Sequence, residues 1–214
     1  MMDTTLLLVR HAQTASNTKG RYMGWMDEDL SEEGIWQAEQ LSQRLRHWPI
    51  SAIFSSPLER ACRTAKIVAS PHDLTVQELD GLGEIRIGAW EGMFAEEIAQ
   101  KFPELWRAWR TDPSDVQMPG GESLAQVNER AISTLETVMS DNQGQQVLAV
   151  THDVIVRLLV AYCLQASTSI YRRLEVTNAS LTVIQRTSDR YRLRLLNDTG
   201  HLEGKFLAAG RDHL

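Results

Sequence analysis

The sequence predicts an α/β fold, a three-layer sandwich in which a mostly parallel sheet has helices on both faces and a small cap over its carboxyl edge. Two observations lead to this prediction. Short apolar runs typical of buried strands alternate along the chain with longer segments of helical periodicity, which is the pattern of strand–helix–strand units. Near the C-terminus, two runs that alternate apolar and polar residues predict an antiparallel hairpin instead.

The N-terminal half is expected to supply three strands and two helices. Short apolar runs between polar segments predict strands at Thr4–Val9, Ala52–Phe54 and Val76–Leu79. Ser31 is a suitable N-cap for a helix that ends before Pro49. The serines and proline of Ser55–Pro57 predict the start of the second helix. The polar segment His11–Asp29 is expected to be a loop.

The C-terminal half is expected to add helices, one strand and the hairpin. Phe94–Trp109 has helical spacing and precedes a loop rich in Pro and Gly, so we interpret residues 94–121 as a partial cap. Helices are predicted at Glu122–Met139 and Asp153–Leu164, a strand at Val147–Val150, and the hairpin at Leu181–Arg186 and Tyr191–Leu195. We see no repeat or linker, which favours one domain over residues 1–214.

The composition excludes several function classes. A formal charge of −6 argues against a general nucleic-acid binder, which needs a basic face. The sequence contains neither an apolar stretch near the ~20 residues that span a bilayer nor a cleavable leader. Cys62 and Cys163 lie in apolar helical patterns and are expected to be buried, reduced thiols rather than a disulfide or a metal site. These features favour a cytoplasmic protein that binds no nucleic acid or membrane.

Two histidines stand at the ends of similar buried strands. One strand reads LLLVRH and ends at Arg10 and His11; the other reads VLAVTH and ends at His152. In open α/β sheets the ligand crevice lies beyond the carboxyl ends of the strands, so parallel neighbours would bring both imidazoles into one pocket. A third strand leads into the helix that carries Arg60. We therefore expect these four side chains to converge.

Such a cluster suits phosphate chemistry. Two guanidiniums provide forked donors that match phosphate oxygens, and a helix that starts near Pro57 adds positive dipole character. With an ordinary pKa of ~6.5, one imidazole can be a neutral nucleophile while the other is held protonated beside the anion. Nucleophile, cations and proton donor are the components that phosphoryl transfer requires.

The string LVRHAQTASN resembles the signature of the histidine phosphatase superfamily, also called phosphoglycerate mutase-like. The segments GRYMGWMDEDLSEEG, IFSSPLERACRTA, LGEIRIGAWEG, PGGESL and VTHDVIVR follow in the family's order and spacing. The resemblance therefore covers about Leu6 to Ala179. It implies the phosphoglycerate mutase-like sandwich and a small phosphate ester as substrate, with no metal or cofactor. A homodimer is a further, family-level expectation.

The resemblance also implies roles for individual residues. His11 corresponds to the residue that becomes phosphorylated, and Arg10, Arg60 and His152 to the rest of the phosphate pocket. Glu84 corresponds to the proton donor; the residues alone do not distinguish it from Glu78 or Glu91. Further substrate contacts are expected from Asn17, Thr14, Met23, Gly24 and Trp25.

Three positions depart from the family pattern. Ala12 replaces a commoner glycine, and Met23 replaces a frequent glutamine, so that a polar phosphate contact is lost or made by backbone. Asp153 stands where glycine is usual. It is expected to cap the following helix, to weaken substrate binding or to raise the pKa of His152.

Three functions are compatible with these motifs. The RIGAWEG segment after Glu84 and the short chain favour a phosphatase similar to the α-ribazole and broad-specificity phosphatases. A cofactor-dependent phosphoglycerate mutase is the second hypothesis, although such mutases usually carry a longer insert and a longer tail. A phosphate-binding regulator without turnover is the third, kept open by Met23 and Asp153.

Overall fold

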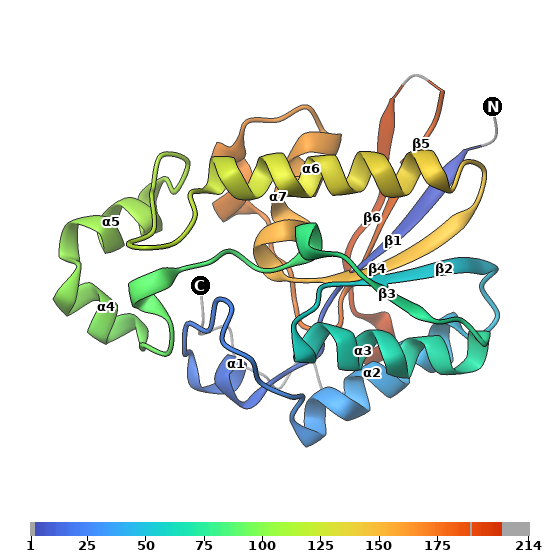
Figure 1. Cartoon of the computed structure of the whole chain (residues 1–214), viewed down its shortest axis with the longest axis horizontal. Coiled ribbons are helices and arrows are strands. Elements are labelled where there is room, and N and C mark those ends of the chain that lie inside the picture. The colour runs from blue at the N-terminus through green and yellow to red at the C-terminus, as the bar shows by residue number, and fades with distance from the viewer. Residues whose placement is uncertain (1–2, 189, 203–214) are drawn as a thin grey trace.

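The computed structural model describes residues 3–188 and 190–202. Its centre is a sheet with the strand order β3-β2-β4-β1-β5-β6 (Figure 1). The strands are β1 (Thr4–Arg10), β2 (Ile50–Ser55), β3 (Val76–Glu78), β4 (Gln146–Thr151), β5 (Leu181–Arg186) and β6 (Tyr191–Asp198). The first four pair in parallel, whereas β5 and β6 run antiparallel, which confirms the predicted mixed sheet and hairpin.

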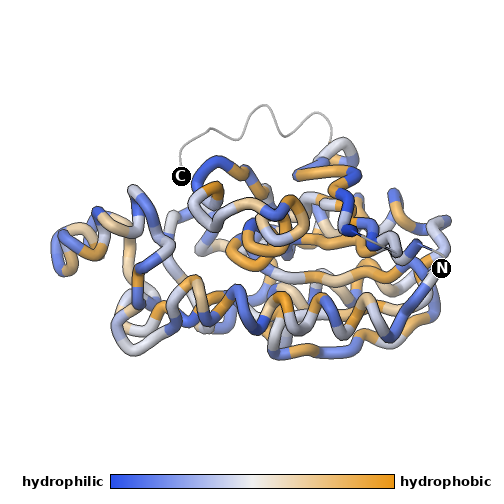
Figure 2. Tube along the Cα trace, turned by 90° about the horizontal axis from the view of Figure 1, so that it is seen from above, coloured by the Kyte–Doolittle hydropathy of each residue, from blue (hydrophilic) through white to orange (hydrophobic). Residues whose placement is uncertain are grey.

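Alternate residues of the central strands belong to two separate apolar layers. Leu6 and Leu8 pack with helices α6 (Leu124–Asp141) and α7 (Asp153–Cys163). Leu7 and Val9 pack on the other face with α2 (Glu32–Leu45) and α3 (Glu59–Ala69). Figure 1 shows these helix pairs on opposite sides of the sheet, and in Figure 2 the strands carry long hydrophobic stretches. The buried strands and two helical layers confirm the predicted three-layer fold.

The two N-terminal helices start in different ways. Ser31 caps α2 as predicted, since its hydroxyl accepts the amide of Gly34 at 3.1 Å. Helix α3 begins at Glu59, later than predicted, and has no cap from its own N-cap residue. Its first amide donates to Asp27 Oδ1 at 2.7 Å. The serines before Pro57 are therefore not its caps, and Ser56 becomes available to the candidate site.

The segment His11–Asp29 was predicted to be a loop, but it contains the short helix α1 (Ala15–Lys19). Thr14 and Asn17 form a capping box at its start, and Gly20 ends it in the left-handed conformation, with φ of 67°. The cap residues and the glycine were both visible in the sequence. The helix was missed because five residues are too few to show an apolar periodicity.

The predicted helical segment Phe94–Trp109 is two helices, α4 (Ala95–Lys101) and α5 (Pro103–Thr111). Phe102 lies between them in a non-helical conformation, with φ of −132° and ψ of 55°. Proline disfavours the helical conformation of the preceding residue but fits the first helical position, so Pro103 ends one helix and starts the next. Both helices lie at the end of the molecule toward which β1 runs (Figure 1).

Short 3-10 turns complete the described chain, at Ser70–His72, Asp80–Leu82, Gly88–Trp90, Thr168–Arg173 and Gly200–Leu202. Cys62 and Cys163 are buried and unpaired, as predicted. In the described part of the chain, no helix combines the length and apolar character that crossing a bilayer requires.

Candidate active site

The candidate site lies where parallel strands end. Arg10 of β1 pairs with Thr151 of β4, so the next residues, His11 and His152, leave the sheet side by side. The amide of His11 donates to the carbonyl of Thr151 at 2.8 Å. Both imidazoles are buried, and their ring centroids are 5.1 Å apart. The structure thus confirms that the two strand ends bring the histidines together.

His11 has a tautomer that is suited to nucleophilic attack. Its Nδ1 lies 2.8 Å from the carbonyl of Ala12, which can only accept, so Nδ1 donates and the lone pair is on Nε2. Burial, followed by the positive charges of Arg60 and Arg10, holds the pKa of His11 well below its ordinary value. The imidazole is therefore neutral at physiological pH.

His152 is neutral as well. Burial, Arg60, His11 and Arg10 together hold its pKa well below its ordinary value. Two guanidiniums thus oppose a positive charge on either imidazole in the unliganded site, while a protonated imidazole beside a bound anion stays a prediction. The Nε2 atom of His152 lies 2.7 Å from the hydroxyl of Ser56. Ser56 was missed, although it follows a parallel strand as the two histidines do.

Both predicted arginines are anchored by backbone carbonyls. Nη1 of Arg10 donates to Val176 at 2.6 Å, and Arg60 donates from Nη1 to Met26 and from Nη2 to Gly24, at 3.0 and 2.8 Å. Arg60 is buried, and this burial lowers its pKa. Neutral carbonyls fix the position of each guanidinium but leave its positive charge to act on the buried imidazoles.

Two buried nitrogen atoms of this cluster have no hydrogen-bond partner within the described residues. They are Nε of Arg10 and Nδ1 of His152. The hydroxyl of Ser56 accepts the amide of Leu58 at 3.2 Å, and when it donates its hydrogen to His152 Nε2, the single proton of the neutral His152 ring is on Nδ1. Buried donors without partners are costly unless a ligand accepts from them. The cluster is therefore built for an anion.

Glu84 lies in a loop that hydrogen bonds hold beside the histidine and arginine cluster. Its carbonyl accepts hydrogen bonds from the indole of Trp25 and from Nη2 of Arg130, the latter at 2.9 Å. Burial above all, with a contribution from Asp153, raises the pKa of Glu84 to about 7, against the opposing effects of the Ile85 amide, Arg60 and Arg10. A carboxyl that titrates near neutrality can both donate and accept a proton, as general acid–base catalysis requires.

Arg130 braces the Glu84 loop from helix α6. It donates to the carbonyls of Gly81 and Gly83 at 3.1 and 2.7 Å, and it pairs with Glu122 at 2.9 Å. The hydroxyl of Thr151 holds the same loop from the sheet, through the carbonyl of Leu82 at 2.6 Å. The sequence did not reveal this brace, because contacts between a helix and a distant loop leave no local pattern.

Thr14 and Asn17 lie beside His11, at the start of α1. The side-chain oxygen of Asn17 accepts from the amide and hydroxyl of Thr14 and from Nδ2 of Asn178, at 3.0, 3.2 and 3.2 Å. Asn178, which was not predicted, also donates to the carbonyl of His11 at 3.0 Å. These contacts use the oxygen of Asn17 and leave its NH₂ group as the donor for a ligand.

Met23, Gly24 and Trp25 support the site from the following loop. Met23 accepts the amide of Met26 through its carbonyl at 2.9 Å, which closes the turn whose carbonyls hold Arg60. Gly24 has a φ of +52°, and a Cβ there would lie 2.6 Å from Ile87 Cγ1, so the close approach requires glycine. Trp25 packs its ring against the guanidinium of Arg86 at 3.6 Å. Direct substrate contacts of these residues stay a prediction.

Asp153 occupies the first turn of α7, between two arginines. Its Oδ1 accepts from Nε of Arg157 at 2.9 Å and lies 3.8 Å from Nη1 of Arg10. The expected rise in the pKa of His152 is wrong, because other groups dominate there and lower it. The carboxylate of Asp153 instead raises the pKa of Glu84. The departure from glycine thus influences the proposed proton donor rather than the histidine beside it.

Replacing Asp153 by asparagine is expected to lower the pKa of Glu84, since a neighbouring negative charge is removed. The alkaline limb of the pH profile of kcat/KM should move to lower pH. The measurement is hydrolysis of an alkyl phosphate between pH 5 and 9, with the exposed Glu175→Gln as a charge-matched control. A limb that stays in place or moves to higher pH contradicts the electrostatic role of Asp153.

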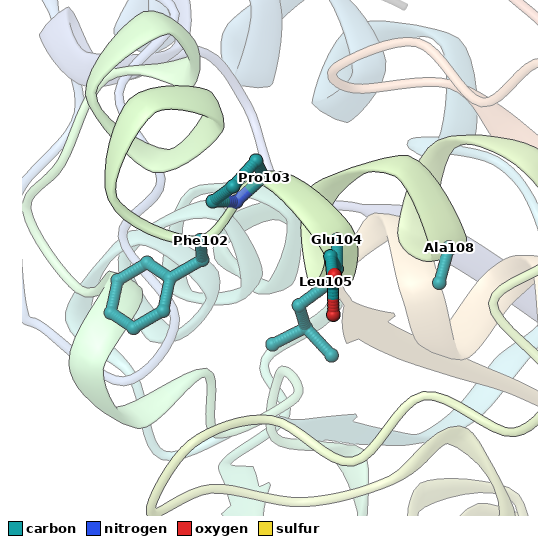
Figure 3. Close-up of a pocket in the computed structure, with 5 residues that line it drawn as sticks. All are labelled: Phe102, Pro103, Glu104, Leu105 and Ala108. Atoms are coloured by element: carbon teal, nitrogen blue, oxygen red, sulfur yellow. The ribbon is translucent and has the colours of Figure 1, made fainter.

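A hollow of about 560 Å³ lies elsewhere, at the junction of α4 and α5 (Figure 3). Phe102, Pro103, Glu104, Leu105 and Ala108 line it. Its lining contains one carboxylate and no histidine, cysteine or cation, so it lacks the groups that phosphoryl transfer requires. The strand-end cluster is therefore the candidate active site.

Known proteins share both this sequence and this fold. A family model of the histidine phosphatase superfamily (branch 1) matches residues 6–199. Phosphoserine phosphatase 1 of Hydrogenobacter thermophilus is 40% identical over 201 residues, which span 94% of this chain and 95% of that protein. Adenosylcobalamin/α-ribazole phosphatase of Salmonella typhimurium is 33% identical over 156 residues, which span 73% of this chain and 77% of that protein.

A solved structure adds a ligand to the comparison. It is a mutant phosphoserine phosphatase from Entamoeba histolytica in complex with phosphoserine. Its TM-score is 0.85 at 26% identity, and the match covers 93% of this chain and 99% of that chain.

Proposed function

We propose that this chain, which belongs to the histidine phosphatase superfamily, hydrolyses phosphoserine with His11 as the nucleophile. The superfamily and the phosphatase branch that the motifs predicted are both confirmed by the family match and the phosphatase relatives. The protein is accordingly an enzyme, a phosphomonoester hydrolase, and neither the mutase nor the regulator hypothesis is retained. The substrate and the residue roles below are our proposals.

The first step transfers the phosphoryl group to the protein. Arg10, Arg60 and His152 hold the phosphate oxygens, and Nε2 of His11 attacks phosphorus in line with the ester oxygen. The P–N bond forms as the P–O bond breaks, and the protonated carboxyl of Glu84 delivers its proton to the leaving alkoxide. The products are a phosphohistidine, a Glu84 carboxylate and free serine.

The second step returns the protein to its starting state. The Glu84 carboxylate takes a proton from water, and the oxygen of that water attacks phosphorus as the P–N bond breaks. The electron pair of that bond returns to Nε2 of His11, and inorganic phosphate leaves. Glu84 is protonated again and ready for the next ester.

The pair of unpartnered buried donors is the observation that carries this proposal. Nε of Arg10 and Nδ1 of His152 offer hydrogens beside an imidazole whose Nε2 holds a lone pair. A bound phosphate satisfies both donors and brings phosphorus to the nucleophile. Its negative charge also offsets the positive charges that now keep both imidazoles neutral.

The relatives support phosphoserine as the substrate. The phosphoserine phosphatase of Hydrogenobacter thermophilus matches nearly the full length of this chain, whereas the α-ribazole phosphatase match is shorter. The similar Entamoeba histolytica structure is described as binding phosphoserine.

A phosphate-release assay in EDTA tests the proposal. The panel contains phosphoserine, 3-phosphoglycerate, α-ribazole phosphate and p-nitrophenyl phosphate. We expect the highest kcat/KM with phosphoserine and no loss of rate on chelation. A higher kcat/KM with α-ribazole phosphate contradicts the substrate, and full loss of activity in EDTA contradicts the metal-free mechanism. Phosphate transfer within 3-phosphoglycerate without release contradicts the hydrolase itself.

A further inference from the structure

Arg172 is a partly buried cation anchored to helix α5 through Trp109. It belongs to the 3-10 turn Thr168–Arg173, called η4 here. Its guanidinium carbon lies 5.3 Å from the ring centroid of Trp109 and 5.7 Å from that of Tyr171. Nε and Nη2 both donate to the carbonyl of Trp109, at 3.1 Å for Nε. This anchor uses one edge of the guanidinium and leaves the Nη1–Nη2 edge for another acceptor.

No carboxylate of residues 3–188 and 190–202 forms an ion pair with this cation. The ion pairs found among the described residues involve five other arginines, and none involves Arg172 or Arg110. Burial, and to a smaller extent the positive charge of the nearby Arg110, lowers the pKa of Arg172. A partly buried guanidinium that repels its neighbour and has lost hydration gains free energy when an anion binds.

A short series of contacts connects Arg172 to the phosphate site. The ring of Tyr171 contacts Arg172, and its carbonyl accepts Nη1 of Arg157 at 3.0 Å. Arg157 donates to Asp153 at 2.9 Å, and Asp153 lies 3.8 Å from Arg10. Burial above all, with the charges of Asp153 and Glu84, raises the pKa of the Tyr171 hydroxyl. A continuous series of contacts therefore links Arg172 to the phosphate site.

We propose that Arg172, assisted by Arg110, forms a second anion subsite that binds the carboxylate of the substrate. This inference rests on the proposed function, because phosphoserine carries a carboxylate beyond its phosphate. Arg10 and Arg172 supply positive charges for the phosphate and the carboxylate of phosphoserine, whereas the carboxylate of Asp153, 3.8 Å from Arg10, is also paired with Arg157 at 2.9 Å.

In this proposal, helix α5 positions the two arginines of the subsite. The carbonyl that anchors Arg172 comes from Trp109, and Arg110 follows it in the same helix, with its guanidinium 5.7 Å from the ring centroid of Trp106. The region 94–121, which we propose to be a cap, thus positions both cations. Because the cap positions the two arginines that bind the carboxylate, we expect it to select phosphate esters that carry a carboxylate.

Substitution of Arg172 by glutamine tests the subsite. The readout is the ratio of kcat/KM for phosphoserine to kcat/KM for p-nitrophenyl phosphate, which has no carboxylate. We expect this ratio to fall about 10- to 100-fold, mainly through KM, because a charge-assisted bidentate contact is lost. Arg173→Gln, an exposed neighbour of equal charge, should leave the ratio unchanged.

A second variant separates the subsite from the fold of the cap. Arg110→Gln changes an exposed side chain and should lower the same ratio by a smaller factor. Equal losses on both substrates after Arg172→Gln, or an unchanged ratio in both variants, overturn the proposal.

If the unmodified protein does not hydrolyse phosphoserine, the proposed substrate fails while the subsite is still tested. The comparison is then between 3-phosphoglycerate and glycerol 3-phosphate, which differ in the carboxylate. A preference for 3-phosphoglycerate that Arg172→Gln removes supports the subsite. The absence of such a preference overturns it.

Discussion

Replacing His11 by alanine is expected to lower kcat/KM for every phosphate ester by roughly 10⁴- to 10⁶-fold, the range seen when an enzyme loses its nucleophile. The physical reason is that Nε2 of His11 carries the lone pair that attacks phosphorus. Nδ1 donates its hydrogen to the carbonyl of Ala12, and the lowered pKa of His11 keeps the ring neutral. His152 cannot replace it, because its Nε2 is engaged by Ser56. The measurement is phosphate release from phosphoserine and p-nitrophenyl phosphate.

A trapping experiment identifies the atom that carries the phosphoryl group. Rapid acid-free quenching of the unmodified protein with radiolabelled substrate should give a phosphoprotein that is labile in acid and stable in base, and His11→Ala should give none. Retained binding of inorganic phosphate by the variant shows that the arginines still form their pocket. An acid-stable phosphoprotein, or a variant with more than about one-hundredth of the normal rate, contradicts the role of His11.

The convergence of His11 and His152 could be predicted because it depends on one rule, that parallel strands deliver the residues after them to the same edge. The rule acts on each strand separately, so it is readable from local apolar runs. It applies equally to Ser56, which follows β2. Ser56 was overlooked as a site residue because it was interpreted, together with Ser55 and Pro57, as a helix start.

Other parts of the site depend on contacts that no local pattern encodes. Glu84 could be selected among nearby glutamates only through the family resemblance, because its raised pKa results from burial by distant segments. Arg130 reaches the Glu84 loop from α6, and Asn178 reaches His11 from beyond η4. The lowered pKa of His152 in the unliganded site was not predicted, for a related reason. Two imidazoles and two guanidiniums are close together, and their mutual repulsion is known only once the distances are known.

Replacing Glu84 by glutamine is expected to slow hydrolysis of phosphoserine by about 10²- to 10⁴-fold, the usual contribution of a general acid–base group. Glutamine keeps the size of the side chain but cannot give a proton to the leaving serine alkoxide. The loss of kcat/KM for p-nitrophenyl phosphate should be much smaller, because nitrophenolate leaves without protonation. Equal slowing of both substrates argues against Glu84 as the acid.

The pH dependence provides an independent check on the same carboxyl. The transfer step needs Glu84 protonated, and its pKa in the unliganded protein is about 7. As pH rises through that value the acid form is lost, so kcat/KM for phosphoserine should fall on the alkaline side with a midpoint near 7. In Glu84→Gln this limb should be absent, while ionisation of the substrate phosphate affects both proteins alike. A limb that persists in the variant assigns the titration to another group, and Glu84 then cannot be the proton donor.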